Sequence, residues 1–243
     1  MSLRLPQAIA IQPRRTVGER IAVGIDRAQA FLRPRTPFTA LNTVSRHLDR
    51  EASSLLDVGC GRGEPMRFLG GKLRLFSTGV DIFTPYLREC QRAGVHSQYV
   101  RCDVRRLPFR AKSFDVVLCM EVLEHLAEAE GGQLIGALER LARHQVIFTT
   151  PVGEHEQHEF DDNAYQAHQH IWAPAEMKER GYKVWGHGLR NLGGMSGIQS
   201  PLPLPLRPLV DVLWVFAGLI SRFRPELAGH MVCIKNLERG RGG

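Results

Sequence analysis

The feature that most constrains this chain is a glycine-rich segment that directly follows a short apolar strand. The run Ser54–Val58 is apolar and has the length of a buried strand. It passes straight into Gly59-Cys-Gly-Arg-Gly63, after which a short helix is expected over residues 64–69. Glycines let a backbone turn tightly and approach a ligand where a Cβ would clash. A strand, a glycine turn and a helix in this order predict a ligand site at the end of the strand.

Runs typical of strands alternate with runs typical of helices up to residue 150. The expected strands are 54–58, 75–80, 99–102, 114–119 and 145–150. The expected helices are 37–50, 64–69, 85–92, 121–126 and 130–143. Because parallel strands need long crossover connections, this alternation predicts an α/β fold with a doubly wound, mostly parallel sheet.

The regular alternation of strands and helices ends after Pro151. Residues 151–172 are polar and rich in histidine, so a long loop is expected there. The expected elements that follow are a helix at 174–180, a strand at 183–186, a glycine- and proline-rich loop at 189–208, an apolar helix at 209–220 and a strand at 230–235. The last two strands bring the sheet to seven.

Charge and element spacing together suggest three parts. Residues 1–50 contain nine arginines and three acidic residues, so the N-terminal part is basic although the whole chain has a net charge of only +7. We expect a basic N-terminal arm at 1–36, a domain at 37–236 with an insertion at 189–228, and a short tail at 237–243. A basic arm can bind an anionic partner, and it can equally be a solvated segment.

The five cysteines form no Cys-x-x-Cys pair. An odd number of unpatterned cysteines argues against a disulfide framework or a zinc knuckle and favours a reducing, cytoplasmic compartment. The N-terminus also lacks the apolar run and cleavage site of a secretory signal.

An acidic residue closes the second expected strand. Asp81 follows Asp57 by 24 positions, and a carboxylate at that place can accept hydrogen bonds from both hydroxyls of a ribose. A nicotinamide-type glycine pattern would need a glycine where this chain has Glu64. The ligand predicted here is therefore a nucleoside without a pyrophosphate.

Four segments in the same order resemble class I S-adenosylmethionine-dependent methyltransferases. They are Leu55-Leu-Asp-Val-Gly-Cys-Gly-Arg-Gly63, Gly79-Val-Asp81, Cys102-Asp103 and Phe114-Asp-Val-Val-Leu-Cys-Met-Glu-Val-Leu-Glu-His-Leu126. Within that family the chain is similar to the small-molecule branch that includes quinone-biosynthesis enzymes. The resemblance implies the Rossmann-like methyltransferase fold and S-adenosyl-L-methionine as the cofactor.

The resemblance also implies where each part of the cofactor would lie. Asp57 and the loop Gly59, Cys60, Gly61 and Gly63 would face the methionine part, which Met120 and Glu121 would border. The remaining implied contacts are Asp81 with the ribose, Ile82 with the adenine ring, and Asp103 with Val104 beside the adenine amino group.

Two residues after the fourth strand are candidates for catalysis. Glu121 and His125 are expected above the carboxyl edge of the sheet, where sites form in α/β proteins. His125 can act as a general base near neutral pH, or it can simply pin a helix. A helical spacing of four would place both side chains on one face. No metal ligands are assigned.

The His-rich segment 154–172 allows two functional interpretations. Its histidines and carboxylates could bind a transition metal, but their spacing matches no zinc pattern, so a polar lid or acceptor contact is favoured. Tyr165 and Trp172 either line the acceptor pocket or pack in the core.

The apolar helix 209–220 is too short to span a bilayer. It can cap the core, form a dimer contact or cover a lipid-like acceptor, so a monomer and a homodimer both stay open. Arg222 and Arg224 after it suit a peripheral membrane contact and suit solvent equally well.

Three functions remain. The first is methyl transfer to a small or lipid-linked metabolite, with oxygen as the expected acceptor atom. The second is RNA methylation with the basic arm on phosphates. It is disfavoured because the chain has Cys119-Met-Glu-Val122 where enzymes that methylate nucleic-acid amino groups carry an Asn- or Asp-Pro-Pro-aromatic turn, and because it has no Pro-Cys dipeptide. The third is a non-catalytic, cofactor-binding regulatory protein.

Overall fold

The computed structural model describes residues 39–70, 75–153, 163–188 and 218–238. These residues all belong to the unit Pro34–Gly243. The expected basic arm at 1–36, the loop at 189–208 and most of the tail lie outside the described residues.

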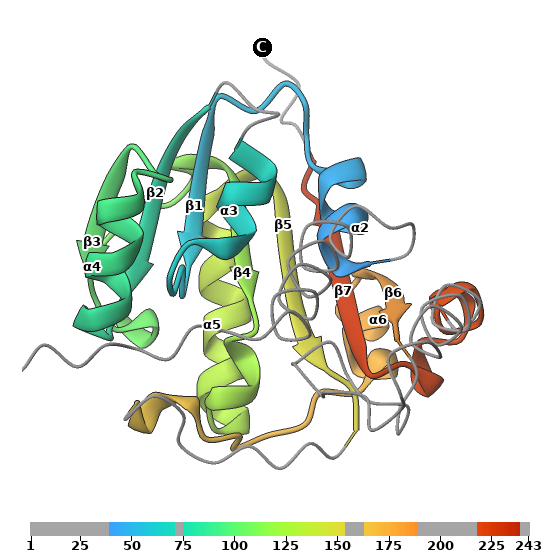
Figure 1. Ribbon diagram of the computed structural model, residues 1–243. Helices are drawn as coiled ribbons and strands as arrows, with labels where there is room; N and C mark the ends of the chain where they lie inside the picture. The colour runs from blue at the N-terminus through green and yellow to red at the C-terminus, as the bar shows by residue number, and fades with distance from the viewer. Residues whose placement is uncertain (1–38, 71–74, 154–162, 189–217, 239–243) are drawn as a thin grey trace, which may run out of the picture. The chain divides into compact units, whose positions relative to one another are not determined.

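A single sheet of seven strands runs through the described residues (Figure 1). The strands are β1 Ser54–Val58, β2 Phe76–Asp81, β3 Gln98–Arg101, β4 Phe114–Met120, β5 Ala142–Pro151, β6 Lys183–His187 and β7 His230–Asn236. Their order is β3-β2-β1-β4-β5-β7-β6, and only β7 runs antiparallel to its neighbours. The expected seven-stranded, mostly parallel sheet is confirmed.

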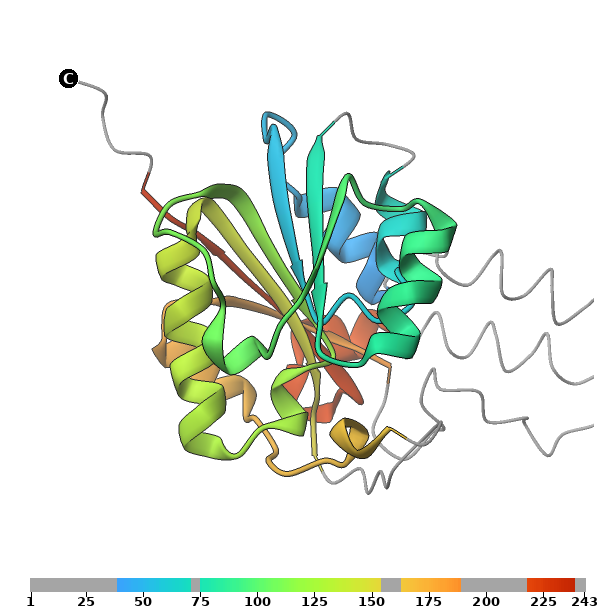
Figure 2. The same cartoon turned by 90° about the vertical axis from the view of Figure 1, so that its left-hand side faces the viewer.

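Helices cover both faces of this sheet (Figure 2). The helices on one face are α2 Ala40–His47, α3 Glu64–Leu69 and α4 Thr84–Ala93. Those on the other face are α5 Glu128–Leu141 and α6 Pro174–Glu179. Short 3-10 turns complete the connections, namely η3 Val104–Arg106, η4 Leu123–His125, η5 Ala164–Gln166 and η7 Pro225–Leu227.

Each face of the sheet has its own apolar core. Leu134 and Leu138 of α5 pack on Val117 of β4 and Phe148 of β5 on one side. On the other side, apolar residues of α2 and α3 cover β1 and β4, led by Val44. β4 is buried on both faces, which explains the apolar run Val116–Cys119 along most of its length. This double covering fixes the strand ends and so the edge where the site forms.

The expected elements agree closely with the observed ones up to β5, with one exception. The run 121–126 was expected to be helical, but only Leu123–His125 forms a single 3-10 turn. Glu121 before it adopts a left-handed backbone with φ of 53°, and Val122 is not helical either. The physical reason is that the chain must turn sharply out of β4 before α5 can begin.

The apolar helix expected at 209–220 is described only in part. Residues 218–223 are helical, so the helix ends three residues later than expected. Residues 209–217 lie outside the described residues. Among the helices that the structure describes, none is both long and apolar enough to cross a bilayer.

The reversed direction of β7 matters for the site. In an antiparallel strand the first residue lies level with the last residues of its neighbours, and His230 pairs with Pro151 of β5 and His187 of β6. The beginning of β7 therefore joins the carboxyl edge of the parallel strands.

A buried carboxylate holds the opposite edge together. Asp115 is 5% exposed, and its Oδ2 accepts hydrogen bonds from Ser53 N at 2.9 Å, Ser53 Oγ at 2.7 Å and Ser54 N at 3.1 Å. Its Oδ1 accepts from Arg143 at 2.9 Å. Burial raises the pKa of Asp115, but these hydrogen bonds outweigh it and hold the pKa well below its usual range. The charged form is therefore the stable one in the fold.

We expect Asp115→Asn to lower the free energy of unfolding by about 2 kcal/mol at pH 7, because the donors lose a charged acceptor. Urea denaturation measures this loss. Since the folded pKa is depressed, the stabilisation is present above the unfolded pKa of about 3.9 and disappears as the pH falls through the folded value. The difference between wild type and variant should therefore shrink in acid.

The matched control is Glu226→Gln, which removes one partner of an exposed ion pair with Lys178. It should change stability by less than about 0.5 kcal/mol. Equal stability of Asp115→Asn and wild type at pH 7 would contradict this role.

Candidate functional site

The glycine loop after β1 is held against the end of β2. The backbone N–H groups of Gly59 and Cys60 both donate to the carbonyl of Val80, each at 2.9 Å. Gly59 has a φ of 71°, and a Cβ there would collide with the side chain of Val122. Only glycine satisfies both constraints, so the loop lies close to the turn that follows β4.

Asp81 ties the loop to the end of β2 through both carboxylate oxygens. Oδ2 accepts from Gly61 N at 2.9 Å, and Oδ1 accepts from Phe83 N at 2.8 Å. Burial raises the pKa of Asp81, and these two backbone hydrogen bonds oppose the shift. Each carboxylate oxygen can accept more than one hydrogen bond, so both can still receive a hydroxyl from a ligand.

Other candidate residues follow along the same edge. Ile82 comes directly after β2, half-buried, and Asp103 and Val104 begin η3 after β3. Met120 is the last residue of β4 and is half-buried. The structure thus places Ile82, Asp103, Val104 and Met120 at the carboxyl ends of strands, as the sequence predicted.

The Asp103 carboxylate already has a strong partner. Arg105 donates to both of its oxygens, at 2.9 Å and 2.6 Å, and Arg105 N donates to Oδ1 at 2.9 Å. The side-chain hydrogen bonds from Arg105 lower the pKa of Asp103. A ligand amino group would share this carboxylate with the guanidinium.

Asp57 lies in β1, just before the glycine loop. It is 1% exposed, and its Oδ2 lies 3.3 Å from Nε2 of His96.

Glu121 stands at the end of β4 in a strained, left-handed conformation. Its N–H donates to the carbonyl of Thr149 on β5 at 3.1 Å, and its Oε2 lies 3.4 Å from Nε2 of His230. Desolvation raises the pKa of Glu121, but His230 more than compensates, so the net pKa is lowered. Conversely, the carboxylate of Glu121 raises the pKa of His230 against the effect of burial. The two form an ion pair beside the loop.

Glu124 is a second, very different carboxyl group. It is 3% exposed, and burial together with the nearby charge of Glu121 raises its pKa well above the ordinary value. The pKa values of Glu124 and Glu121 are therefore shifted in opposite directions. Environments that separate the pKa values of neighbouring groups are typical of functional sites.

His125 is half-buried, and its Nδ1 lies 3.3 Å from the carbonyl oxygen of Ala167. A carbonyl can only accept, so Nδ1 carries the hydrogen and Nε2 keeps the basic lone pair. Burial lowers the pKa of His125, and the Ala167 carbonyl offsets this only in part. The ring is therefore neutral at physiological pH.

The expectation that Glu121 and His125 lie one turn apart on a helix is wrong. Glu121 belongs to the strand end and His125 to a 3-10 turn. The two side chains still influence each other electrostatically, since the charge of Glu121 raises the pKa of His125.

The second half of the His-rich segment is packed against η4. Trp172 is fully buried and donates from Nε1 to the carbonyl of Leu123 at 3.2 Å, so it is a core residue and does not line a pocket. The backbone N–H of Gln169 donates to the Glu124 carbonyl at 2.7 Å. Tyr165 is half exposed. Of the expected lid at 154–172, residues 154–162 lie outside the described residues.

His230 is the residue that sequence reasoning missed. It sits at the start of the last strand, far from the glycine loop in sequence. Only the antiparallel direction of β7 brings it to the carboxyl edge, and an expectation of parallel strands hides that proximity. A polar residue opening an otherwise apolar final strand was the available signal.

Comparison with known proteins adds to this geometry. Residues 56–150 match the family model described as a methyltransferase domain. A ubiquinone biosynthesis O-methyltransferase from Methylobacterium nodulans is 36% identical over 102 residues, which are 36% of this chain and 39% of that protein. The chain thus spans less than half the length of the curated relatives it matches.

Solved structures share the fold at low identity. One is the putative methyltransferase in complex with the Trm112 activator of Haloferax volcanii, with a TM-score of 0.56, 16% identity, and coverage of 94% of this chain and 100% of that one. Another is an S-adenosylmethionine-dependent methyltransferase from Archaeoglobus fulgidus, with a TM-score of 0.52, 18% identity, and coverage of 87% and 94%.

The sheet order, the glycine loop tied to Asp81 and the matched residues lead to one conclusion. This chain carries a class I S-adenosylmethionine-dependent methyltransferase domain, and the cofactor of the domain is S-adenosyl-L-methionine.

Proposed function

We propose that this protein transfers a methyl group from S-adenosylmethionine to an oxygen of a small or lipid-linked metabolite in the cytoplasm. The observation that carries the proposal is the meeting of the Asp81-held glycine loop with Glu121, His125 and His230 at one sheet edge. The named relatives, O-methyltransferases of ubiquinone biosynthesis, support oxygen as the acceptor atom. The five free cysteines support a reducing compartment.

In this proposal, different residues along the carboxyl edge of the sheet contact different parts of the cofactor. Asp81 accepts from the ribose hydroxyls, Ile82 packs on the adenine, and Asp103 with Val104 receives the adenine amino group. The loop from Gly59 to Gly63, which includes Cys60 and Gly61, lies against the methionine part together with Asp57 and Met120.

A sulfonium already carries its leaving group, so the protein needs to align the acceptor, exclude water and accept one proton. We assign the proton to His125 Nε2, because Nδ1 is committed to Ala167 and the lowered pKa keeps the ring neutral. Glu121, paired with His230, supplies negative charge near the sulfonium. The raised pKa of the buried Glu124 favours its neutral form, which adds no second negative charge beside Glu121.

The acceptor class is tested by incubating the full chain with methyl-labelled cofactor and fractionated cell extract. The proposal expects label in a small-molecule or lipid fraction, in a bond that resists mild base as an ether does. Label in RNA, lost when the basic arm 1–35 is removed, would support a nucleic-acid acceptor instead. Tight cofactor binding without transfer to any fraction would indicate a regulatory protein.

Replacing Asp81 tests the cofactor contacts. We expect Asp81→Ala to weaken S-adenosylmethionine binding by about 2 kcal/mol, or ~30-fold in Kd, because two hydroxyls lose a charged acceptor. Calorimetry on the folded variant measures it, and Glu176→Gln in the α6 ion pair with Arg180 is the control, with unchanged affinity. Wild-type affinity in a folded Asp81→Ala chain would remove Asp81 from the cofactor site.

Replacing His125 tests the base. We expect His125→Ala to lower kcat by roughly 10²–10³-fold while cofactor affinity stays near wild type. Because only the neutral ring accepts a proton and burial lowers its pKa, the wild-type rate should hold through pH 6.5 and fall at lower pH.

The control for the base is His144→Ala, which removes a histidine paired with Asp49 at the opposite edge and should leave kcat unchanged. A stable His125→Ala enzyme with near-normal kcat and an unaltered pH profile would show that His125 takes no proton.

A further inference from the structure

Two thiols and an imidazole meet beneath the glycine loop, from three separate segments. Cys60 belongs to the loop itself, Cys90 to α4, and His96 to the turn before β3. Their sulfur atoms and a ring nitrogen all lie within 4.8 Å of one another, and all three residues are buried. The sequence places them 30 and 6 positions apart, a spacing that no familiar metal motif has.

Two glycines leave the room that this cluster occupies. A Cβ on Gly79 of β2 would lie 2.9 Å from Nε2 of His96 and 3.1 Å from Sγ of Cys60. A Cβ on Gly63 would lie 2.7 Å from Sγ of Cys90. Any side chain at either position would push the thiols and the ring apart, so the glycines here serve the cluster as well as the turn.

The His96 ring is buried without a well-formed hydrogen bond to the described residues. Neither ring nitrogen of His96 makes a hydrogen bond of good geometry, although Nε2 lies 3.3 Å from Oδ2 of Asp57. The His96 side chain is fully buried. Leaving a buried polar group unsatisfied costs about 1–3 kcal/mol, so such a group calls for a reason.

The surrounding contacts hold the ring in place. The hydroxyl of Tyr99 accepts from His96 N at 2.9 Å and donates to the Cys90 carbonyl at 3.2 Å, which links the two ligand-bearing segments. The two rings pack edge to face at 5.6 Å. This arrangement fixes His96 before any ligand arrives.

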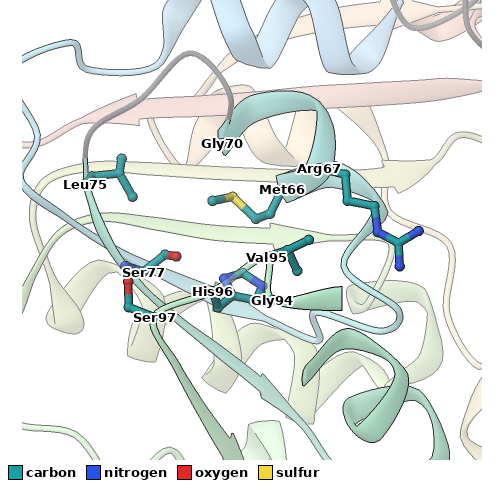
Figure 3. A pocket seen from close by; sticks show the side chains of 9 residues that line it. All are labelled: Met66, Arg67, Gly70, Leu75, Ser77, Gly94, Val95, His96 and Ser97. Atoms are coloured by element: carbon teal, nitrogen blue, oxygen red, sulfur yellow. Dashed lines mark hydrogen bonds between the residues drawn. The ribbon is translucent and has the colours of Figure 1, made fainter. Parts of the chain in front are cut away.

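A pocket lies beside the cluster. It is lined from α3 and from the turn before β3, and His96 is among its lining residues together with Met66 and Val95 (Figure 3). The pocket lies toward the amino ends of β2 and β3, away from the carboxyl edge where the cofactor is expected.

We propose that Cys60, Cys90 and His96 bind a single Zn²⁺ ion, with Asp57 as the neighbouring carboxylate. Two thiolates and an imidazole are ligands that zinc prefers. Zn–S bonds are about 2.3 Å long, so tetrahedral sulfur ligands lie about 3.8 Å apart, and small side-chain rotations reach that from the observed separations. Asp57 is placed to accept from the ring nitrogen that the metal does not take, an arrangement that orients metal-binding histidines.

The bound ion would act structurally. It would join the glycine loop to α4 and to the turn before β3, three segments that already meet through apolar packing, the Arg62–Glu89 ion pair and the hydrogen bonds of Tyr99. Since both thiols lose their protons on binding, each ion would release two protons. The cluster shares Cys60 with the proposed cofactor contacts, but its test measures metal binding alone, so either proposal can fail without the other.

The test uses the full chain, reduced with a phosphine and freed of metal by a chelator, and titrated with Co²⁺ alone. We expect one Co²⁺ per chain, with strong visible bands of tetrahedral cobalt and a sulfur-to-cobalt charge-transfer band, both removed by Zn²⁺. Cys90→Ser and His96→Gln should each weaken binding by at least tenfold. Cys102→Ser, which alters a half-buried cysteine outside the cluster, should bind as wild type does.

X-ray absorption of the zinc-loaded wild-type chain keeps the test decisive if a variant fails to fold. Two sulfur neighbours and one imidazole at zinc are expected. Absence of the charge-transfer band in the wild type, fewer than two sulfur neighbours, or unchanged binding in folded Cys90→Ser and His96→Gln would each overturn the proposal.

Discussion

The structure depends on one tight turn, the glycine loop that leaves β1 and is held against the end of β2. Val80 accepts two backbone hydrogen bonds from this loop, and Asp81 accepts a third. Because Gly59 lies against Val122, the same turn also fixes where the chain leaves β4. One local backbone conformation thus sets the positions of three strand ends, which is where a nucleoside-binding edge needs precision.

The carboxyl edge of the sheet brings together titratable groups whose pKa values are shifted in different directions by their surroundings. His230 lowers the pKa of Glu121, while burial raises that of Glu124, although the two are three residues apart. Burial lowers the pKa of His125, and a backbone carbonyl fixes its tautomer. These shifts suit the proposed reaction, which begins with a cation and releases a proton.

Much of the fold follows from the sequence because its signals are local. The limits of β1 and α3 are as expected, since an apolar run, glycines and a proline at the helix start all act within a few residues. The places of the candidate cofactor residues in the fold are predictable for the same reason, because each lies at or just beyond the carboxyl end of a strand.

What could not be predicted depends on contacts distant in sequence. His230 reaches the site only because β7 runs antiparallel. Trp172, in a polar segment, is buried because it packs under η4. The left-handed backbone of Glu121 breaks the helix that local spacing suggested, and Cys60, Cys90 and His96 meet only once the sheet has formed.

The central claim is that the nucleoside lies at the edge formed by the glycine loop and Asp81. A crystal structure of the chain with S-adenosylhomocysteine tests it most directly. The account predicts both ribose hydroxyls within hydrogen-bonding distance of the Asp81 carboxylate and the amino-acid part against the loop from Gly59 to Gly63. A nucleoside bound elsewhere, for instance in the pocket beside His96, with Asp81 contacting no ligand, would contradict it.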